Sequence, residues 1–557
     1  MVTLEQYQRD REVWRQRWYQ KGFFGPDTVA QVLEKAIQQR PDTEFAFYHT
    51  AETAAETRIF HFKIGELWAK SRRVANGLRA EGVRANEVIA IQMPTWYETV
   101  LVYLAAFQIG AIVLPIVHIY GPREVEFILR QSKAKTLVIP HRWHKVDFIE
   151  RFRKIGTLPD LERVVVVGGD TPPDMVAWQR IEENKAPPLP VYVGDPDSAC
   201  TLIYTSGTTS SPKGVLYSHN NLQSEWHGPF FATKGPYLCN FPAGHIAGFN
   251  FVLRPMVQGI PMVFFDHWDP ELAAEAIEKY RVQESGGTGF FLRGLLRYKH
   301  EKNLDFSSLK LFSMGGTGVT PAEIKLAEDH GFKAGRGYGS TEHSTVTMTS
   351  LVFPFDKRSR TDGRLLPGVQ ARIVDGEGNE LPVGAQGEIV TQGPELFIGY
   401  MDPELNQESF LPGGWFCTGD IGRLDEEGFL TITDRKKDVI IRGGENIASK
   451  EVEDILNSMP EVVESAATAM PDERYGEKVC AFVRVAAGSS LDLEKIRAFF
   501  ADAGVARQKT PERLIVLEEF PRTPAGKVKK FELRTQLREE FAQRQALEKN
   551  ALADKTG

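Results

Sequence analysis

Apolar positions recur along the chain with two periods, one typical of helices and one of strands. Residues 26–40 and 64–83 carry apolar side chains three and four positions apart, which predicts two amphipathic helices. Residues 45–50 and 58–63 predict two strands separated by a hairpin-length connection. Further short apolar strands are predicted at these positions: 87–93, 136–140, 163–168, 261–266 and 309–316. Such alternation predicts α/β domains with largely parallel sheets.

The pattern changes after about Thr361. From there to residue 436 the chain predicts short strands separated by Gly, Asp and Asn turns, which indicates a β-rich subdomain. A compact α+β unit then follows, and its predicted elements are a helix over 443–459, strands over 465–472 and 479–485, and a helix over 491–504. The charged run 434–438 lies where the two parts join, and it is interpreted either as a solvated turn or as a hinge between domains.

One apolar stretch, residues 100–120, is long enough on paper to cross a membrane. Gln108, Gly110, Pro115 and His118 interrupt it. The prediction is therefore a buried helix that ends near Gly110, followed by a buried strand rich in β-branched residues. A transmembrane helix is the weaker alternative.

The composition is that of a globular protein, and its charge balance is common among metabolic enzymes and among many other soluble proteins. Of 557 residues, 42% are hydrophobic and 25% charged, and the net charge of −7 argues against a surface built for phosphate backbones. The four cysteines form no C-x-x-C pair, so neither a disulfide framework nor a zinc ribbon is indicated. The first residues contain no apolar signal-peptide core. We expect a cytoplasmic protein.

The N-terminal segment places Trp14 and Trp18 among arginines and lysines. A basic aromatic helix can bind a membrane surface or RNA. Because the two tryptophans are four positions apart, packing against the rest of the domain is the preferred interpretation, and contact with a membrane is left open.

Residues 204–214 are the most informative segment, because they combine hydroxyl side chains, glycines and Lys213 between two apolar strands. Backbone N–H groups and hydroxyls suit polyphosphate oxygens, and the lysine supplies positive charge. The segment is no P-loop, since Pro212-Lys213-Gly214 leads into a strand rather than a helix. Composition alone leaves a Ser/Thr-rich surface turn as an equal alternative.

Three further segments carry candidate chemistry, each weak by itself. Residues 337–343 place an aromatic beside two glycines, then a hydroxyl and a carboxylate, which suits a base, a phosphate and Mg²⁺. Thr418-Gly419-Asp420 ends a predicted strand in a turn, where the acid can bind a ribose diol. Residues 522–530 contain no acid and form a local positive loop, which is usually only a solvated turn.

Taken together and in this order, the four segments resemble the adenylate-forming superfamily of acyl-CoA synthetases, peptide-synthetase adenylation domains and beetle luciferases. The resemblance covers residues 28–537, and the matching motifs lie at 204–214, 241–245, 315–317, 338–342, 415–420, 434–438, 442–446 and 521–527. Lys530 stands where many members have arginine. The resemblance implies an α/β N-terminal domain with a β-rich subdomain (residues 1–436, the latter 361–436) and a small mobile α+β domain (437–557).

The resemblance implies a two-step ligase that uses ATP, Mg²⁺ and CoA. Lys527 is expected between the carboxylate and the α-phosphate, Glu342 and Thr205 at the metal, and Lys437 at the hinge. Residues expected at the phosphates are Thr205, Ser206, Gly207, Thr208, Thr209, Lys213 and Thr341. Residues expected around adenine and ribose are Gly315, Gly316, Thr317, Tyr338, Gly339, Asp420, Arg435 and Asn446.

By the same resemblance the acyl pocket is lined by His245, Gly287, Gly289, Phe290, Gly315 and Gly339. The segment 286–291 departs from the proline-containing loop common in relatives, and its glycines are expected to widen the pocket. With no lysine, arginine or acid there, we expect a bulky apolar acid (fatty, alicyclic, steroid-like or aryl) rather than an amino acid. His245 gates the tunnel, stacks on the acyl group or simply packs.

The alternatives are an enzyme that loads a carrier protein and a nucleotide-binding homologue without catalysis. Luciferin oxygenation also stays open, as does a homodimer. A non-catalytic homologue is expected to lose Lys527, Glu342 or Asp420, and all three are present.

Overall fold

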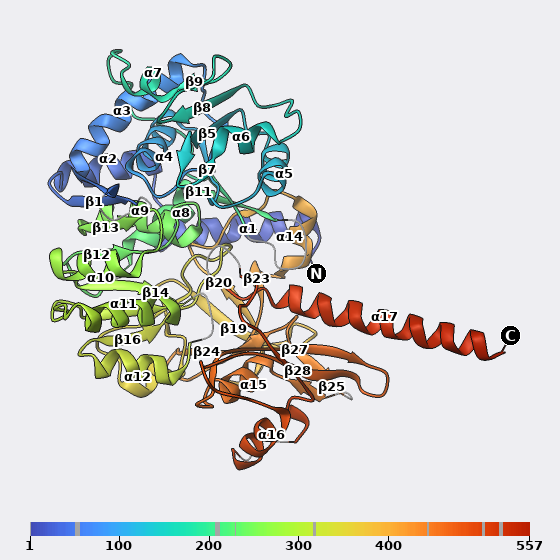
Figure 1. Ribbon diagram of the computed structural model, residues 1–557. Coiled ribbons are helices and arrows are strands. Elements are labelled where there is room, and N and C mark those ends of the chain that lie inside the picture. The colour runs from blue at the N-terminus through green and yellow to red at the C-terminus, as the bar shows by residue number, and fades with distance from the viewer. Residues whose placement is uncertain are drawn as a thin grey trace.

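The computed structural model describes residues 2–50, 56–205, 212–228, 230–315, 319–442, 445–503, 507–522 and 527–556, leaving aside the side chains of 227, 445, 446 and 544–556. The chain runs from an N-terminal α/β region at the top of Figure 1 to a C-terminal unit at the bottom, from which the last helix projects.

Two mostly parallel sheets form the larger part of the fold. The eight-stranded sheet has, in order, β21 (Gly399–Tyr400), β11 (Gly214–Ser218), β10 (Ala199–Tyr204), β4 (Ile112–Pro115), β3 (Val88–Ile91), β5 (Thr136–Pro140), β8 (Arg163–Val167) and β9 (Val176–Ala177). The seven-stranded sheet has β16 (Lys333–Arg336), β15 (Leu311–Met314), β14 (Glu284–Gly287), β12 (Tyr237–Cys239), β13 (Met262–Phe265), β1 (Glu44–His49) and β2 (Arg58–Lys63). In these two sheets the antiparallel pairs are β11 with β10, β21 with β11, and β2 with β1; β21 and β2 are edge strands, and β11 lies next to β21.

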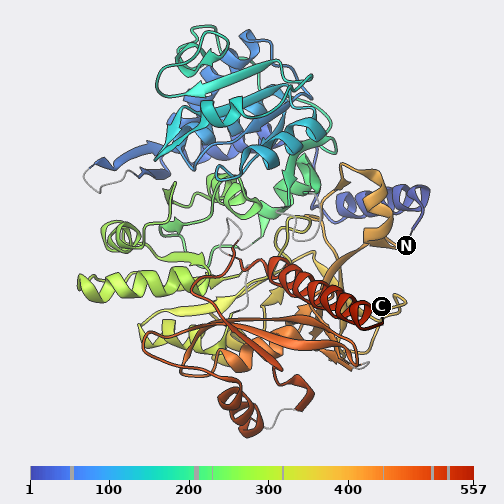
Figure 2. The ribbon, with the colours of Figure 1, turned by 45° about the vertical axis from the view of Figure 1, so that its right-hand side comes forward.

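Two smaller sheets complete the architecture (Figure 2). The antiparallel β-rich sheet contains β19 (Gln370–Val374), β20 (Gly387–Gln392), β22 (Phe410–Leu411), β23 (Trp415–Leu424) and β24 (Leu430–Arg435). The C-terminal sheet contains β25 (Ile440–Arg442), β26 (Glu445–Ile447), β27 (Val462–Asp472), β28 (Gly476–Val485) and β29 (Arg513–Val516). Short two-stranded ribbons are made by β6 (Arg142–Trp143) with β7 (Val146–Asp147) and by β17 (Thr347–Met348) with β18 (Arg364–Leu365).

The helices connect and cover these sheets. Their bounds are α1 (Leu4–Gln20), α2 (Val29–Gln39), α3 (Ile64–Ala80), α4 (Tyr97–Ile109), α5 (Pro122–Ser132), α6 (Phe148–Arg153), α7 (Trp178–Glu182), α8 (His219–His227), α9 (Ile246–Gln258), α10 (Pro270–Lys279), α11 (Gly289–Glu301), α12 (Pro321–Asp329), α13 (Phe355–Arg360), α14 (Pro403–Ser409), α15 (Ser449–Leu456), α16 (Leu493–Asp502) and α17 (Lys530–Thr556).

The apolar stretch 100–120 is a buried helix followed by a buried strand, as predicted. The side chains of α4 are buried from Val100 to Ile109, in the largest hydrophobic cluster. Gly110 ends the helix with φ 80°, a left-handed conformation that glycine adopts without strain, and β4 follows. Among the described residues, no helix combines the length and apolar character needed to cross a bilayer.

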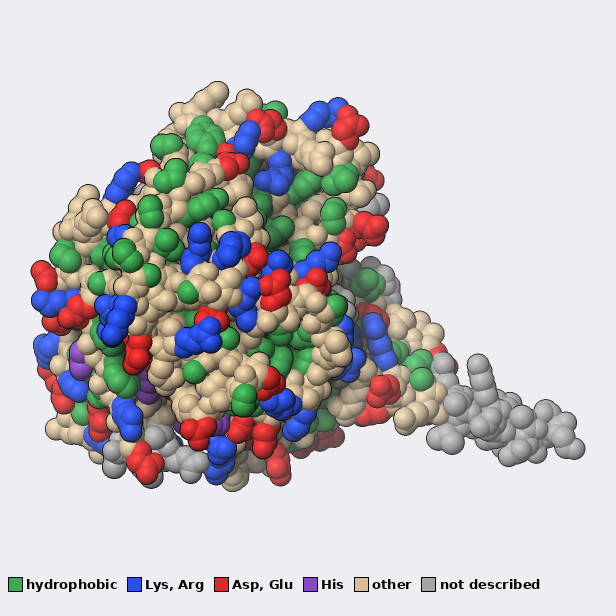
Figure 3. All heavy atoms as spheres, turned by 90° about the horizontal axis from the view of Figure 1, so that it is seen from above, with side chains coloured by type: hydrophobic (Ala, Val, Ile, Leu, Met, Phe, Trp, Pro, Cys, Tyr) green, Lys and Arg blue, Asp and Glu red, His purple; other side chains and the backbone are tan. Residues whose placement is uncertain are grey.

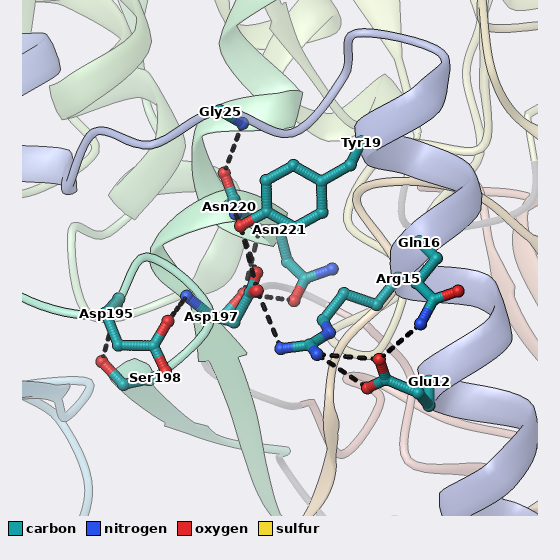
Figure 4. A network of polar contacts seen from close by, with 11 residues as sticks. Glu12, Arg15, Gln16, Tyr19, Gly25, Asp195, Asp197, Ser198, Asn220 and Asn221 are labelled. Atoms are coloured by element: carbon teal, nitrogen blue, oxygen red, sulfur yellow. Dashed lines mark hydrogen bonds and ion pairs between the residues drawn. The ribbon is translucent and has the colours of Figure 1, made fainter.

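The N-terminal helix α1 packs on the domain through its aromatic side chains, which confirms the preferred interpretation of this segment. Trp18 is fully buried, and α1 lies beside α14 in both ribbon views. Figure 4 shows Arg15 and Tyr19 pointing toward Asp197, at 3.1 and 3.0 Å from its Oδ2 atom. On the face seen in Figure 3, acidic and basic side chains are interspersed, with no continuous basic area.

The β-rich sheet lies within residues 370–435 and the C-terminal sheet within residues 440–516, and two local predictions in this part of the chain are corrected. The helix predicted over 443–459 is wrong at its start, because residues 445–447 pair with β25 and α15 begins only at Ser449. Asp434 accepts hydrogen bonds from the backbone N and Oγ of Ser449, at 2.6 and 2.9 Å, and thereby anchors that start. Thr418-Gly419-Asp420 does not end a strand but lies inside β23, where Gly419 has φ 70°.

Candidate functional site

The hairpin β10–β11 presents the two ends of the segment expected to bind phosphates. The backbone N of Thr205 donates to the Lys213 carbonyl at 3.0 Å, and the backbone N of Lys213 donates to Oγ1 of Thr205 at 3.3 Å. These bonds close the base of the loop. Ser206, Gly207, Thr208 and Thr209 lie outside the described residues.

The segment 338–343 follows β16 and packs against the same edge of the eight-stranded sheet. Tyr217 on β11 donates to the Thr341 carbonyl at 2.8 Å. Tyr400 on β21 donates from its phenol to Oε1 of Glu342 at 2.7 Å. A Cβ atom on Gly339 would lie 2.0 Å from the Ser344 carbonyl, so only glycine fits in this turn. The candidate phosphate and metal ligands of two segments, far apart in the sequence, therefore share one edge of a sheet.

Asp420, Arg435 and Tyr338 form a connected polar group next to these residues. Asp420 pairs with Arg435 across β23 and β24, and its Oδ1 lies 2.9 Å from Nε of Arg435. The Tyr338 phenol donates to Oδ2 at 2.6 Å. Burial and the charge of Asp420 raise the pKa of Tyr338 well above its usual value, so it remains a donor. The aromatic residue expected at adenine and the acid expected at ribose are thus in direct contact.

Lys527 reaches this site from the C-terminal unit. The pKa of its amine is lowered from 10.5 to about 8, mainly by burial; the charges of Arg435 and Lys437 also lower it, while those of Asp420 and Glu342 raise it. The pKa of His245 falls to about 4, mainly through burial and additionally through the charge of Lys527. The charge of the lysine therefore acts on the histidine of α9 and on the acids of the nucleotide side.

The residues expected on the acyl side of the site lie at the start of α9 and near the end of β14. His245 caps α9, and its Nδ1 accepts from the backbone N of Ala247 at 3.3 Å. The next glycine along this side, Gly315, donates from its backbone N to the Gly287 carbonyl at 3.2 Å. A Cβ on Gly315 would lie 2.8 Å from the Gly337 carbonyl, so the adenine and acyl segments touch through backbone alone.

Neighbouring side chains occupy much of the room that the glycines of segment 286–291 provide. A Cβ on Gly286 would meet the Tyr237 hydroxyl at 2.7 Å, and one on Gly287 would meet the Phe291 ring at 2.8 Å. A Cβ on Gly289 would lie 1.7 Å from Oε1 of Glu323. The missing side chains of these glycines leave room for neighbouring groups of the protein, whereas from the sequence we expected them to widen the acyl pocket. The Phe290 side chain is 61% exposed at the start of α11.

The remaining expected residues are described only in part. Gly316 and Thr317 lie outside the described residues. Of Asn446 only the backbone is described, in β26 opposite Ile441. Lys437 lies in the turn between β24 and β25, and its carbonyl accepts from Arg534 at 2.8 Å.

Two tyrosines in contact with the site were not among the expected residues. Tyr217 and Tyr400 are both buried, and both belong to strands at the edge of the eight-stranded sheet. Each stands in an apolar run, so nothing local in the sequence distinguishes it from a core residue. The bridge between His343 and Leu396, together with the pairing of β21 with β11, brings Tyr400 to Glu342.

The residues around Glu342 fit Mg²⁺ held mainly by a nucleotide. Mg²⁺ is usually bound by one or two carboxylates together with substrate phosphates and water. In the part of the chain that the structure describes, no group of three or more His, Cys, Asp or Glu side chains converges on one point. The single carboxylate of Glu342, beside the loop expected to bind phosphates, suits Mg²⁺ that is bound mainly by substrate phosphates and water. It does not suit a metal site made entirely of protein ligands.

Comparisons with known proteins match nearly the whole chain. The family model described as AMP-binding enzyme matches residues 33–401, and the model of the AMP-binding enzyme C-terminal domain matches 451–527. The chain is 32% identical to the medium-chain fatty-acid–CoA ligase of Escherichia coli (strain K12), over 97% of this chain and 95% of that protein. It is 31% identical to the 2-hydroxy-7-methoxy-5-methyl-1-naphthoate–CoA ligase of Streptomyces carzinostaticus, over 84% and 87%.

Solved structures share the fold. The crystal structure of ATP-bound MatB from Rhodopseudomonas palustris superposes with a TM-score of 0.77 at 28% sequence identity, covering 91% of this chain and 98% of that one.

Proposed function

The chain belongs to the AMP-binding enzyme family and is an acyl-CoA synthetase, and on that premise we propose that it joins a hydrophobic carboxylic acid to CoA through an acyl adenylate at this site. The observation that carries the assignment of the site is the contact of Tyr338 and Arg435 with Asp420, with the charge of Lys527 acting on the same acid and on Glu342. A cation from the C-terminal unit and two acids, Asp420 in β23 and Glu342 in the segment after β16, would then act where two anionic substrates have to be brought together.

In the first step a carboxylate oxygen attacks the α-phosphorus of ATP, and pyrophosphate leaves. Lys527 neutralises the charge that accumulates between the two anions, and Lys213 with Thr341 and the 205–209 loop binds the phosphates. Asp420, oriented by Arg435 and Tyr338, accepts from the ribose hydroxyls. In the second step the CoA thiol, losing its proton, attacks the acyl carbonyl and AMP leaves. Mg²⁺ held by Glu342 would supply positive charge to the phosphates.

The substrate class is proposed as a medium-chain fatty or aryl acid. Tyr237, Phe291 and their neighbours present apolar surface, and the buried Arg254 on α9 is already paired with Glu225. Because its charge is already balanced by Glu225, the Arg254 guanidinium is not available to pair a second carboxylate on the substrate. The relatives named for medium-chain fatty-acid and naphthoate ligation support the same class.

Mg²⁺ as the physiological cation and the cytoplasm as the compartment are proposed with it. The first rests on Glu342 beside a phosphate loop and the second on four free cysteines. A homodimer stays an alternative for the oligomeric state.

The test is AMP release across a panel of carboxylic acids, with and without CoA. We expect release with hydrophobic acids, and acyl-CoA formed in equal amount when CoA is present. AMP release without thioester formation would favour the carrier-protein alternative. Nucleotide binding without any AMP release, with any acid, would favour the non-catalytic one.

The proposed hinge gives a prediction for Lys437→Pro. The hydrogen bonds between Asp434 and Ser449 join the β-rich subdomain to the C-terminal unit across the boundary at residues 436 and 437. These bonds must break if the C-terminal unit rotates between the two steps. Proline fixes φ near −65°, so it should trap the present arrangement, in which Lys527 faces the acids. We expect pyrophosphate release to survive and thioester formation to fall at least about tenfold, roughly 1.4 kcal/mol.

Lys437→Ala is the matched control, because it removes the same side chain and keeps the backbone freedom. A thermal melt of both variants separates trapping from unfolding. If a folded Lys437→Pro enzyme makes thioester at the normal rate, the hinge lies elsewhere or rotation is not required.

A pH dependence follows from the lowered pKa of Lys527. Only the protonated amine neutralises negative charge, and its pKa of about 8 means that the charge is lost as the pH rises through that value. We expect kcat/KM for pyrophosphate release to decline about tenfold per pH unit above 8, since this quantity reports the free enzyme. Lys527→Arg, charged throughout, should be slower at neutral pH but lack the decline; the same decline in that variant would assign it to another group.

A further inference from the structure

Tyr400 touches two candidate ligands of the nucleotide at once. Its phenol donates to Oε1 of Glu342 at 2.7 Å, and Nζ of Lys213 lies 5.0 Å from its ring centroid. The side chain is buried, with 5% of its surface exposed. The expected metal ligand and the expected phosphate-binding lysine thus meet on opposite parts of one tyrosine, its hydroxyl and its ring.

The backbone of Tyr400 is held by several independent contacts. It pairs with Val215, two residues after Lys213, and its N donates to Oδ1 of Asn406 at 2.8 Å. The Phe397 ring packs on it with centroids 4.9 Å apart. From α1, the Tyr7 phenol donates to the Ile398 carbonyl at 2.6 Å. A strand of two residues is therefore fixed in position from several sides.

A fixed phenol constrains how the Glu342 carboxylate is presented. Hydrogen bonds to a coordinating carboxylate orient it, and losing such a bond typically weakens metal binding by about 10- to 100-fold. The π-face of the same ring attracts the Lys213 ammonium and limits where it extends.

We propose that Tyr400 is a positioning residue, which orients Glu342 toward the divalent cation and Lys213 toward the phosphates of bound ATP. The proposal rests on the proposed function, in that it takes both residues as ligands of the nucleotide–metal complex. The proposal gives Tyr400 of β21 a role in adenylation, which an aromatic residue that only packs in the core would not have.

The test is Tyr400→Phe, which removes only the hydroxyl and keeps the ring beside Lys213 and Phe397. Affinity for Mn²⁺ is measured by electron paramagnetic resonance in the presence of α,β-methylene-ATP, which is not cleaved. We expect the dissociation constant of Mn²⁺ to rise about tenfold. Thioester formation from a supplied acyl adenylate, which needs no metal–triphosphate complex, should be unchanged.

Tyr7→Phe is the matched control, since it removes a buried phenol from the same neighbourhood that contacts neither Glu342 nor Lys213. If both variants melt at a lower temperature, the Mn²⁺ comparison between them still isolates the contact to Glu342. Normal Mn²⁺ affinity in Tyr400→Phe, or an equal loss in Tyr7→Phe, overturns the proposal.

A second arm combines Tyr400→Phe with Glu342→Gln. If the phenol acts through the carboxylate, its removal adds no further loss of Mn²⁺ affinity in that background, whereas independent effects add. Additive losses contradict the proposal. A wild-type enzyme that binds Mn²⁺ with the analogue but never forms an adenylate would contradict the proposed function instead.

Discussion

Lys527→Ala is expected to slow adenylate formation about 10²- to 10³-fold while leaving the reaction of a supplied acyl adenylate with CoA close to normal. A positioned charge that acts only where negative charge accumulates is worth about that factor. The charge of Lys527 acts on Asp420 and Glu342, and the carboxylate–phosphate encounter belongs to the first step alone. The measurement is pyrophosphate release for the first step and thioester formation from synthetic adenylate for the second.

Lys529→Ala serves as the control for this substitution. Lys529 lies two residues away in the same segment, and its Nζ is 2.8 Å from Oε1 of Glu532 rather than in the site. It should lose little activity in either step. An equal loss in both half-reactions of Lys527→Ala would mean that the lysine supports the fold or CoA binding instead of the first transition state.

Glu342→Gln is expected to raise the Mg²⁺ concentration needed for half-maximal adenylation about 10²-fold, with the fold intact. A neutral amide is a much poorer ligand for a hard cation than a carboxylate. The amide can still accept the Tyr400 hydrogen bond, so the packing of β21 should be retained. The measurement is a Mg²⁺ titration of pyrophosphate release, accompanied by a thermal melt.

The control here is Glu271→Gln, which changes an acid on α10 that contacts Lys302. Its Mg²⁺ dependence should match the wild type. Unchanged Mg²⁺ dependence in Glu342→Gln would mean that this carboxylate has a structural role, as the acceptor of the Tyr400 hydrogen bond, and does not bind a cation.

Local patterns predicted much of the fold because burial and backbone preference are local properties. Residues 100–109 are almost entirely apolar and Gly110 follows them, and both the buried helix α4 and its end follow from that. The start of α15 was misplaced because Glu445 and Asn446 fit a helix as well as a strand. Their strand state depends on the hairpin pairing with β25, and the start of the helix depends on the Asp434–Ser449 bonds, which join residues 15 positions apart.

The sequence by itself determined the succession of elements and the family, because periodicity and motif spacing are written along the chain. It also supplied the candidate site residues, among them Lys527, Glu342 and Asp420. Only the tertiary structure decided what surrounds them: that Tyr237 and Phe291 take up the room beside the glycines of β14, and that Tyr400 contacts Glu342. These contacts join strands far apart in the sequence, and their geometry arises from sheet order and packing, which no local pattern encodes.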